Sequence, residues 1–197
     1  MATTESHAQA TRNFNSRELP LSGRWLIDSA HSQVEFVARH MMIAKTRGRF
    51  REFSGTIIIA EDPCESSVEA VIQAASIDTG DAQRDEHLRS ADFLDVDHSP
   101  QILFKSTSVR PARGDHWDVH GNLTVKGIVR PVTLDTEFCG SAQDPWGNLR
   151  AAFLAETEID REDFSITWNQ ALEAGGFLVG KGIKIEIDIE AVRQSDA

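Results

Sequence analysis

Charged side chains that could bind a ligand are concentrated in two short stretches of the sequence, residues 84–87 and 160–163. A guanidinium from Arg84 or Arg161, or an imidazole from His87, can donate hydrogen bonds to an anionic or carbonyl group of a ligand. The alternative is that these stretches supply ion pairs and helix caps that fix one segment of the chain onto another. The two interpretations differ in where the side chains point, and that depends on the fold.

Other motifs associated with catalysis are incomplete. Residues 175–182 nearly match a phosphate-binding P-loop, but Gly182 stands where the Mg²⁺-binding hydroxyl belongs and a strand pattern follows instead of a helix. His116 and His120 are four residues apart in a predicted strand, about 13 Å, which is too far to share a metal ion. The sequence contains neither Gly-x-Ser-x-Gly nor His-Glu-x-x-His. We therefore interpret residues 175–182 as a glycine-rich turn and predict no catalytic residue, no metal site and no cofactor.

One helical stretch interrupts a sequence that otherwise alternates as strands do. Asp81 can cap a helix, and Leu88, Ala91 and Leu94 recur at three-residue spacing. We predict one or two short helices over about residues 81–96, since Ser90 could cap a second one. Three apolar positions are too few for a domain core, but they can cover the open end of a barrel or the edge of a sheet.

The strands on either side of this stretch predict the fold class. The last is the clearest, because Ile183, Ile185, Ile187 and Ile189 alternate with charged residues. About eight strands with mostly short connections predict an all-β, antiparallel up-and-down barrel, with a sandwich as the alternative. A barrel pairs its first strand with its last, so residues 25–28 are expected to bond to residues 183–189.

Length and charge limit the remaining possibilities. The chain has 197 residues, enough for a single domain, which we place at residues 23–197. Its net charge of −11 disfavours nucleic acid as a partner, and no apolar run is long enough to span a membrane. Residues 1–22 are polar and lack a signal-peptide pattern, so we expect a disordered arm and a cytoplasmic protein. Exposed first and last strands could pair two copies in a homodimer.

Several motifs, in order and spacing, resemble those of the YceI family over residues 23–192. They include Trp25-x-x-Asp28-x-x-His31-Ser32, Arg84-Asp85-x-His87-Leu88, Gly121-x-Leu123-Thr124-x-Lys126-Gly127 and Asp160-Arg161-x-Asp163-Phe164. The resemblance implies a lipocalin-like barrel with an elongated apolar pocket that binds polyisoprenoid or related amphiphilic lipids, such as isoprenoid quinones. The family has no agreed catalytic activity. Many members are secreted or periplasmic, and this sequence departs from them in showing no signal.

The apolar side chains expected to line such a pocket come from several strands and one loop. They are Phe36, Phe50, Phe53, Ile57, Val71, Phe104, Leu123, Phe153 and Trp168. The head group of a lipid would be held by His31, Arg84, His87 or Arg161.

Three functional hypotheses follow. The favoured one is a binding protein for a long-chain lipid. The second is an enzyme acting on such a lipid or quinone, which requires His31, Arg84 and His87 to converge in the cavity. The third is an interaction protein without a ligand, which predicts a barrel filled by its own side chains.

Overall fold

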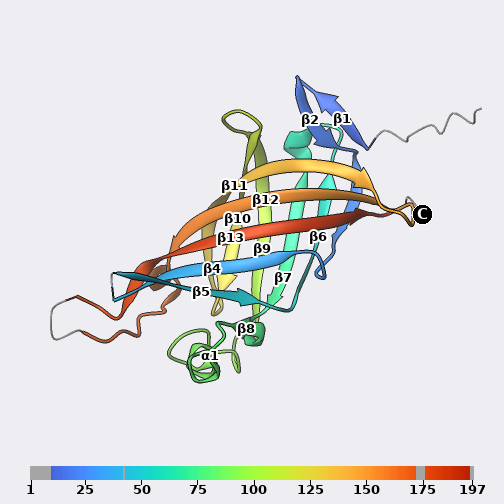
Figure 1. Cartoon of the computed structure of the whole chain (residues 1–197). Coiled ribbons are helices and arrows are strands. Elements are labelled where there is room, and N and C mark those ends of the chain that lie inside the picture. The colour runs from blue at the N-terminus through green and yellow to red at the C-terminus, as the bar shows by residue number, and fades with distance from the viewer. Residues whose placement is uncertain (1–9, 42, 172–175, 196–197) are drawn as a thin grey trace, which may run out of the picture.

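The computed structural model describes residues 10–41, 43–171 and 176–195. Eight antiparallel strands close into a barrel, as predicted (Figure 1). In order around the barrel they are β3 (Gly23–Ile27), β6 (Phe53–Ile59), β7 (Ser67–Gln73), β9 (Gln101–Pro111), β10 (His116–Val125), β11 (Ile128–Gln143), β12 (Leu149–Asp160) and β13 (Val179–Arg193). The alternating apolar residues of these strands face inward, so the barrel interior is the apolar core.

The barrel closes between its first and last strands, but in a different register from the one predicted. Trp25, Leu26 and Ile27 of β3 pair with residues 191–193 of β13. Residues 183–188 pair instead with β4 (Gln33–His40), because the chain turns after β3 and continues along the same edge of β13. The prediction that the first and last strands of the barrel pair is therefore confirmed, whereas the predicted pairing residues of β13 were wrong.

The other edge of β13 is also occupied. It pairs along its length with β12, so the last strand has no free edge for a second copy, contrary to the expectation behind the homodimer. The glycine-rich segment predicted as a turn becomes part of β13 from Val179 onward. Its first residue, at position 175, lies outside the described residues.

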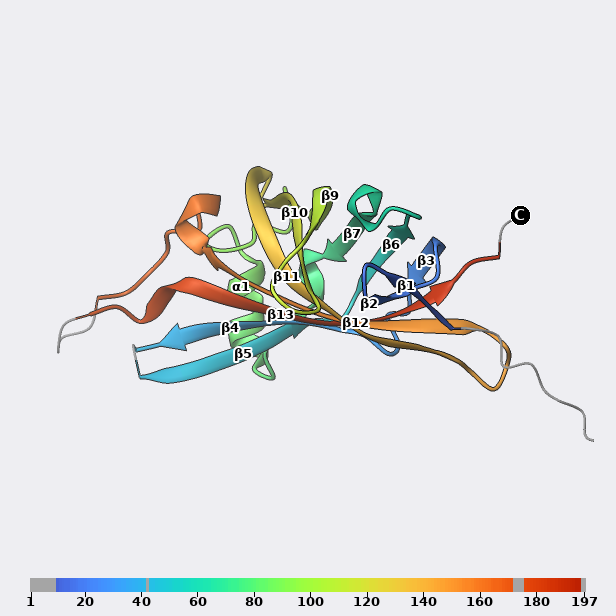
Figure 2. The same cartoon turned by 90° about the horizontal axis from the view of Figure 1, so that it is seen from above.

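Two strands beside β13 extend the barrel wall. β4 pairs with β5 (Ala44–Phe50), and β5 pairs with the short β8 (Ile77–Asp78). Seen from above, β4, β5, β12 and β13 run side by side along one flank, opposite β6, β7 and β9 (Figure 2).

One α-helix, α1 (Ala82–Arg89), covers an end of the barrel, as predicted (Figure 1). The Asp81 side chain caps it by accepting from the backbone N–H of Arg84. Ser90 ends this helix, and turns follow in place of a second one. Phe93 and Leu94 in those turns are buried against the barrel core. Short 3₁₀ turns lie at η1 (Pro63–Glu65), η2 (Ala74–Ser76) and η3 (Arg161–Phe164). Within the described ranges, no helix combines the length and apolar character needed to cross a bilayer.

A β-hairpin occupies much of the segment that we expected to be a disordered arm. Strands β1 (Thr11–Phe14) and β2 (Arg17–Pro20) pair with each other, and Asn15 and Ser16 form the turn with φ angles of 51° and 66°. Two consecutive positive φ angles are typical of a type I′ hairpin turn, which Asn favours. The prediction was therefore wrong for residues 11–20, and residues 1–9 lie outside the described part.

Candidate functional site

The barrel encloses a cavity of about 340 Å³ with an almost wholly apolar lining. Among the residues predicted to line a pocket, Phe36, Phe50, Phe53, Ile57, Phe104, Leu123 and Phe153 do so. The four isoleucines of β13 from Ile183 to Ile189 line it as well. The cavity contradicts a barrel packed solid by its own side chains, so the third hypothesis loses its basis. A long apolar chain is the kind of ligand that such a lining accommodates.

Two of the predicted lining residues lie elsewhere. Val71 faces away from the cavity, because its neighbours Ala70 and Ile72 line it and side chains alternate along a strand. The Trp168 ring packs edge-on against His87 at 4.6 Å between ring centroids and lies 5.3 Å from Phe93. It belongs to the cover of the barrel end.

Two glycines make room for aromatic rings in the wall. A Cβ atom at Gly48 would lie 2.3 Å from the Phe36 ring, and one at Gly121 would lie 2.5 Å from the Phe104 ring. Any larger residue at these positions would push a ring out of place. The glycines therefore fix where Phe36 and Phe104 stand in the lining.

Arg161 is the one positively charged residue among the described residues that line the cavity. It follows β12 as the first residue of η3, and its side chain is 3% exposed. Its Nε donates to the carbonyl of Gly180 at 3.0 Å, and its Nη1 donates to the carbonyls of Ile166 at 2.6 Å and Trp168 at 2.9 Å. The guanidinium is thus held in the wall by backbone oxygens from two segments.

The third guanidinium nitrogen of Arg161, Nη2, differs from Nε and Nη1 in its hydrogen bonding. Nη2 is buried and has no hydrogen-bond partner among residues 10–41, 43–171 and 176–195. Within the same ranges, no carboxylate lies within salt-bridge distance of Arg161. Burial lowers the pKa of this guanidinium, although Arg remains protonated in proteins. A buried donor without an acceptor is costly, so a ligand oxygen that reached Nη2 would be stabilised there.

Arg84 and His87, two of the other residues predicted to hold a head group, do not lie in the cavity wall. Arg84 donates from Nε to the Thr79 hydroxyl at 2.7 Å and from Nη2 to the Thr79 carbonyl at 3.0 Å. His87 Nε2 lies 2.9 Å from an Asp92 oxygen. Neither side chain lines the cavity, and both make the local contacts expected of residues that fix α1 in place. For the stretch 84–87, the structure favours ion pairs and caps over ligand contacts.

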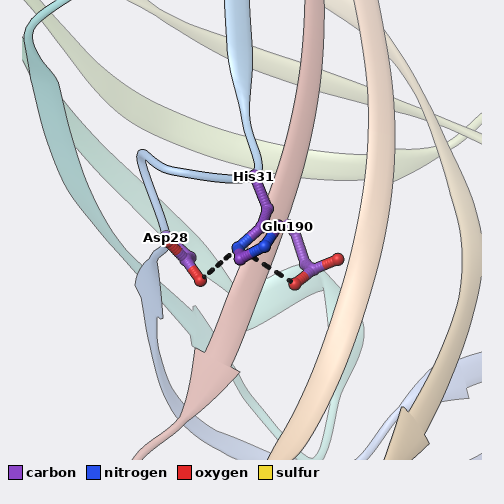
Figure 3. Close-up of side chains that lie close together, drawn as sticks. All are labelled: Asp28, His31 and Glu190. Atoms are coloured by element: carbon purple, nitrogen blue, oxygen red, sulfur yellow. Dashed lines mark hydrogen bonds and ion pairs between the residues drawn. The ribbon is translucent and has the colours of Figure 1, made fainter. Parts of the chain in front are cut away.

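His31 lies in a charged cluster with Asp28 and Glu190 (Figure 3). Its Nδ1 is 2.9 Å from Asp28 and 4.0 Å from Glu190, and the three residues could in geometry surround a cation. That place is taken by Arg150, whose Nη1 donates to both carboxylates and whose Nε donates to Asp144. We interpret the cluster as an ion-pair network. His31 does not line the cavity, so His31, Arg84 and His87 do not converge there and the enzyme hypothesis loses its stated basis.

Because of this network, the free energy of unfolding of the protein depends on pH in the acid range. Hydrogen bonds from Arg150 and then His31 lower the pKa of Asp28 to about 2 from 3.8. A lowered carboxyl pKa contributes stability above pH 3.8, and this contribution is lost as the pH falls toward 2. With allowance for solvent screening, Asp28→Asn should lower the free energy of unfolding by about 1 kcal/mol at pH 5 and by almost nothing at pH 2. Urea denaturation at both pH values checks this, and an equal loss at pH 2 would contradict it.

The comparisons with known proteins agree with this geometry. The family described as YceI-like domain matches residues 25–191. The UPF0312 protein ECA1782 of Pectobacterium atrosepticum and Protein YceI of Salmonella newport are each 39% identical over 168 residues, covering 85% of this chain and 84% of each relative.

Solved structures show the same fold. BcnA of Burkholderia cenocepacia has a TM-score of 0.73 at 25% identity, covering 83% of this chain and 98% of BcnA. A polyisoprenoid binding domain from Saccharophagus degradans has a TM-score of 0.62 at 15% identity, covering 88% of this chain and all of that domain. With a closed eight-stranded barrel and a family match over most of its length, this chain belongs to the YceI family.

Proposed function

We propose that this protein binds and carries a long-chain amphiphilic lipid, of the polyisoprenoid or isoprenoid quinone class, inside the barrel. The observation that carries the proposal is the pairing of an apolar cavity with one buried guanidinium nitrogen of Arg161 that has no hydrogen-bond partner in the described part of the chain. A similar structure is described as a polyisoprenoid binding domain, which supports the same class of ligand. The proposed activity is binding, and no residue is assigned a chemical step.

The lining supplies affinity for the tail. Burial of about ten CH₂ groups contributes roughly 8 kcal/mol before the costs of ordering the ligand are counted. That gross value corresponds to a dissociation constant in the micromolar range. A polar contact is therefore needed for selectivity more than for affinity.

The donors of Arg161 limit the kind of head group. Nε and Nη1 are already used by backbone carbonyls, so only Nη2 can donate to a ligand. The other polar lining residues are few: Glu35, Ser66, Thr136 and Thr157. A phosphate brings more charge and more acceptor oxygens than one nitrogen can satisfy. A single carbonyl oxygen, as in a quinone, fits this donor set better.

A matched pair of ligands tests this contact. We expect wild-type protein to bind a farnesyl-tailed benzoquinone about 10-fold or more tightly than the same tail on a plain benzene ring, because a hydrogen bond from a charged donor is worth about 1.5 to 3 kcal/mol. Arg161→Lys should bring this ratio close to one while keeping the affinity for the benzene compound. Displacement of a fluorescent apolar probe measures both affinities.

The control for this test is Arg84→Lys, at an arginine that does not line the cavity. It should leave the ratio unchanged. If Arg161→Lys also leaves the ratio unchanged, Arg161 does not hold the head group. If neither compound binds to the wild-type protein, the proposed function is wrong.

A further inference from the structure

The cavity has two ends, and different segments close them. Near the start of β9, Ile102 packs with Phe93 and Leu94, which follow α1 in the chain. Near the end of β9, Val109 packs with Leu19 of the N-terminal hairpin (Thr11–Pro20). Seven residues of strand span about 23 Å, or about 17 Å along the axis of a barrel whose strands tilt by about 40°. Figure 1 shows α1 and the hairpin at these opposite ends.

The N-terminal hairpin forms the wall at the second end. Leu19 is 5% exposed and Pro20 is fully buried, and both line the cavity. Leu19 packs in one cluster with Val109, Trp117 and Val119, which also line the cavity. Leu19 is therefore part of the apolar wall at this end of the cavity.

Two arginines fasten this wall to two neighbouring turns of the rim, the β6–β7 turn and the β9–β10 turn. Arg12 donates to the carbonyls of Ala60 at 2.5 Å and Glu61 at 2.7 Å, beyond the end of β6. Arg17 donates to the carbonyls of Ala112 at 2.8 Å and His116 at 3.0 Å, and its guanidinium lies 5.1 Å from the Trp117 ring centroid.

The hairpin strands pair only with each other within the described sheets, so side-chain contacts and the two-residue link to β3 join them to the barrel. A two-stranded hairpin is marginally stable by itself. The arginine contacts and Leu19 therefore decide where the wall stands.

Arg161 lies toward the other end. Its Nη1 bonds to the carbonyl of Ile166, and Ile166 and Phe164 belong to the same buried cluster as Phe93 and Leu94. A ligand whose polar oxygen is held by Nη2 would therefore point its tail toward Leu19. Arg161 thus lies near one end of the cavity and Leu19 near the other.

We propose that the N-terminal hairpin is a length stop that sets the longest chain the cavity accepts, with Leu19 as the residue that meets the end of the tail. The proposal rests on the proposed function. About 17 Å corresponds to an extended chain of about 14 bonds. The hairpin precedes residues 25–191, so this stop is made by residues outside the matched YceI-like domain.

A series of ligands that differ only in length tests the proposal in the full chain. The probes are saturated fatty acids of about 10 to 22 carbon atoms, and affinity should rise about fourfold per added methylene until the tail meets the wall, then fall. Leu19→Ala shortens the wall side chain by two bonds, so the optimum should move to chains longer by about two carbon atoms. Leu19→Trp should move it to shorter chains.

Opposite shifts of the optimum separate a length stop from a merely structural role, which would weaken binding of every chain alike. Leu103→Ala, at a 38% exposed leucine on β9, is the control and should leave the optimum in place. An optimum that stays the same in both Leu19 variants overturns the length stop and leaves the proposed function standing. If the wild-type protein binds no fatty acid, the length stop is overturned, whereas the proposed function is overturned only if the farnesyl-tailed compounds also fail to bind.

Discussion

Replacing Ala155 with tryptophan is expected to reduce binding of long-chain ligands by at least about 100-fold while the barrel still folds. Ala155 lines the cavity from β12, between Thr136 and Ile187 on the neighbouring strands, and both of these line it too. An indole at this position would occupy space that the ligand tail needs. Because the ring would enter an existing cavity, the usual cost of overpacking a core should be small.

The same strand offers a matched control. Ala152 lies three residues earlier and is not among the lining residues, so Ala152→Trp adds the same ring away from the cavity. It should leave affinity within about twofold of wild type, since it removes no apolar contact with the ligand. Affinity can be measured by displacement of a fluorescent apolar probe, with circular dichroism to verify the fold. Equal affinity of folded Ala155→Trp and wild-type protein would place the ligand outside the barrel.

Replacing Arg161 with alanine is expected to lower the free energy of unfolding by about 3 to 5 kcal/mol. The substitution leaves the carbonyls of Gly180, Ile166 and Trp168 without the donor that satisfies them. These carbonyls belong to the segment after η3 and to the start of β13, so the loss should loosen this end of the barrel first. Urea denaturation of lipid-free protein, followed by circular dichroism, measures the change.

Arg110→Ala is the control for this loss. Arg110 is exposed on β9, and the substitution should change the free energy of unfolding by no more than about 0.5 kcal/mol. A loss below about 1 kcal/mol for Arg161→Ala would mean that the guanidinium contributes little to holding these segments together.

The sequence was sufficient to predict the strands that build the cavity. The isoleucines of β13 and the phenylalanines at positions 36, 104 and 153 line the cavity because alternation along a strand fixes which face each side chain takes. The prediction for Val71 is wrong, because Ala70 and Ile72 line the cavity and alternation along β7 turns Val71 to the other face. The alternation of residues along the strands thus predicted most of the side chains that line the cavity.

The ends of the barrel were harder to predict, because long-range contacts decide them. The hairpin segment is polar, and the contacts of Arg12 and Arg17 reach carbonyls 48 to 99 residues away in the chain. No local pattern reveals such contacts. The Asn15-Ser16 turn was the one local signal for a hairpin.

The candidate head-group residues show the same limit. His31, Arg84, His87 and Arg161 all have suitable chemistry, yet only Arg161 lines the cavity. Arg161 is buried because it follows the inward-facing Ile159 at the point where β12 turns into η3. The other three lie at turns or on α1, and the sequence does not tell which side of the barrel wall such residues face.

Native mass spectrometry of freshly purified protein, followed by lipid extraction, tests the central claim most directly. The cavity should hold a guest, so we expect wild-type protein to carry a co-purifying long-chain lipid and Ala155→Trp protein to be free of it. Repeated recovery of wild-type protein without lipid, together with no uptake of added farnesyl-tailed quinone, would contradict the claim that this barrel carries a lipid.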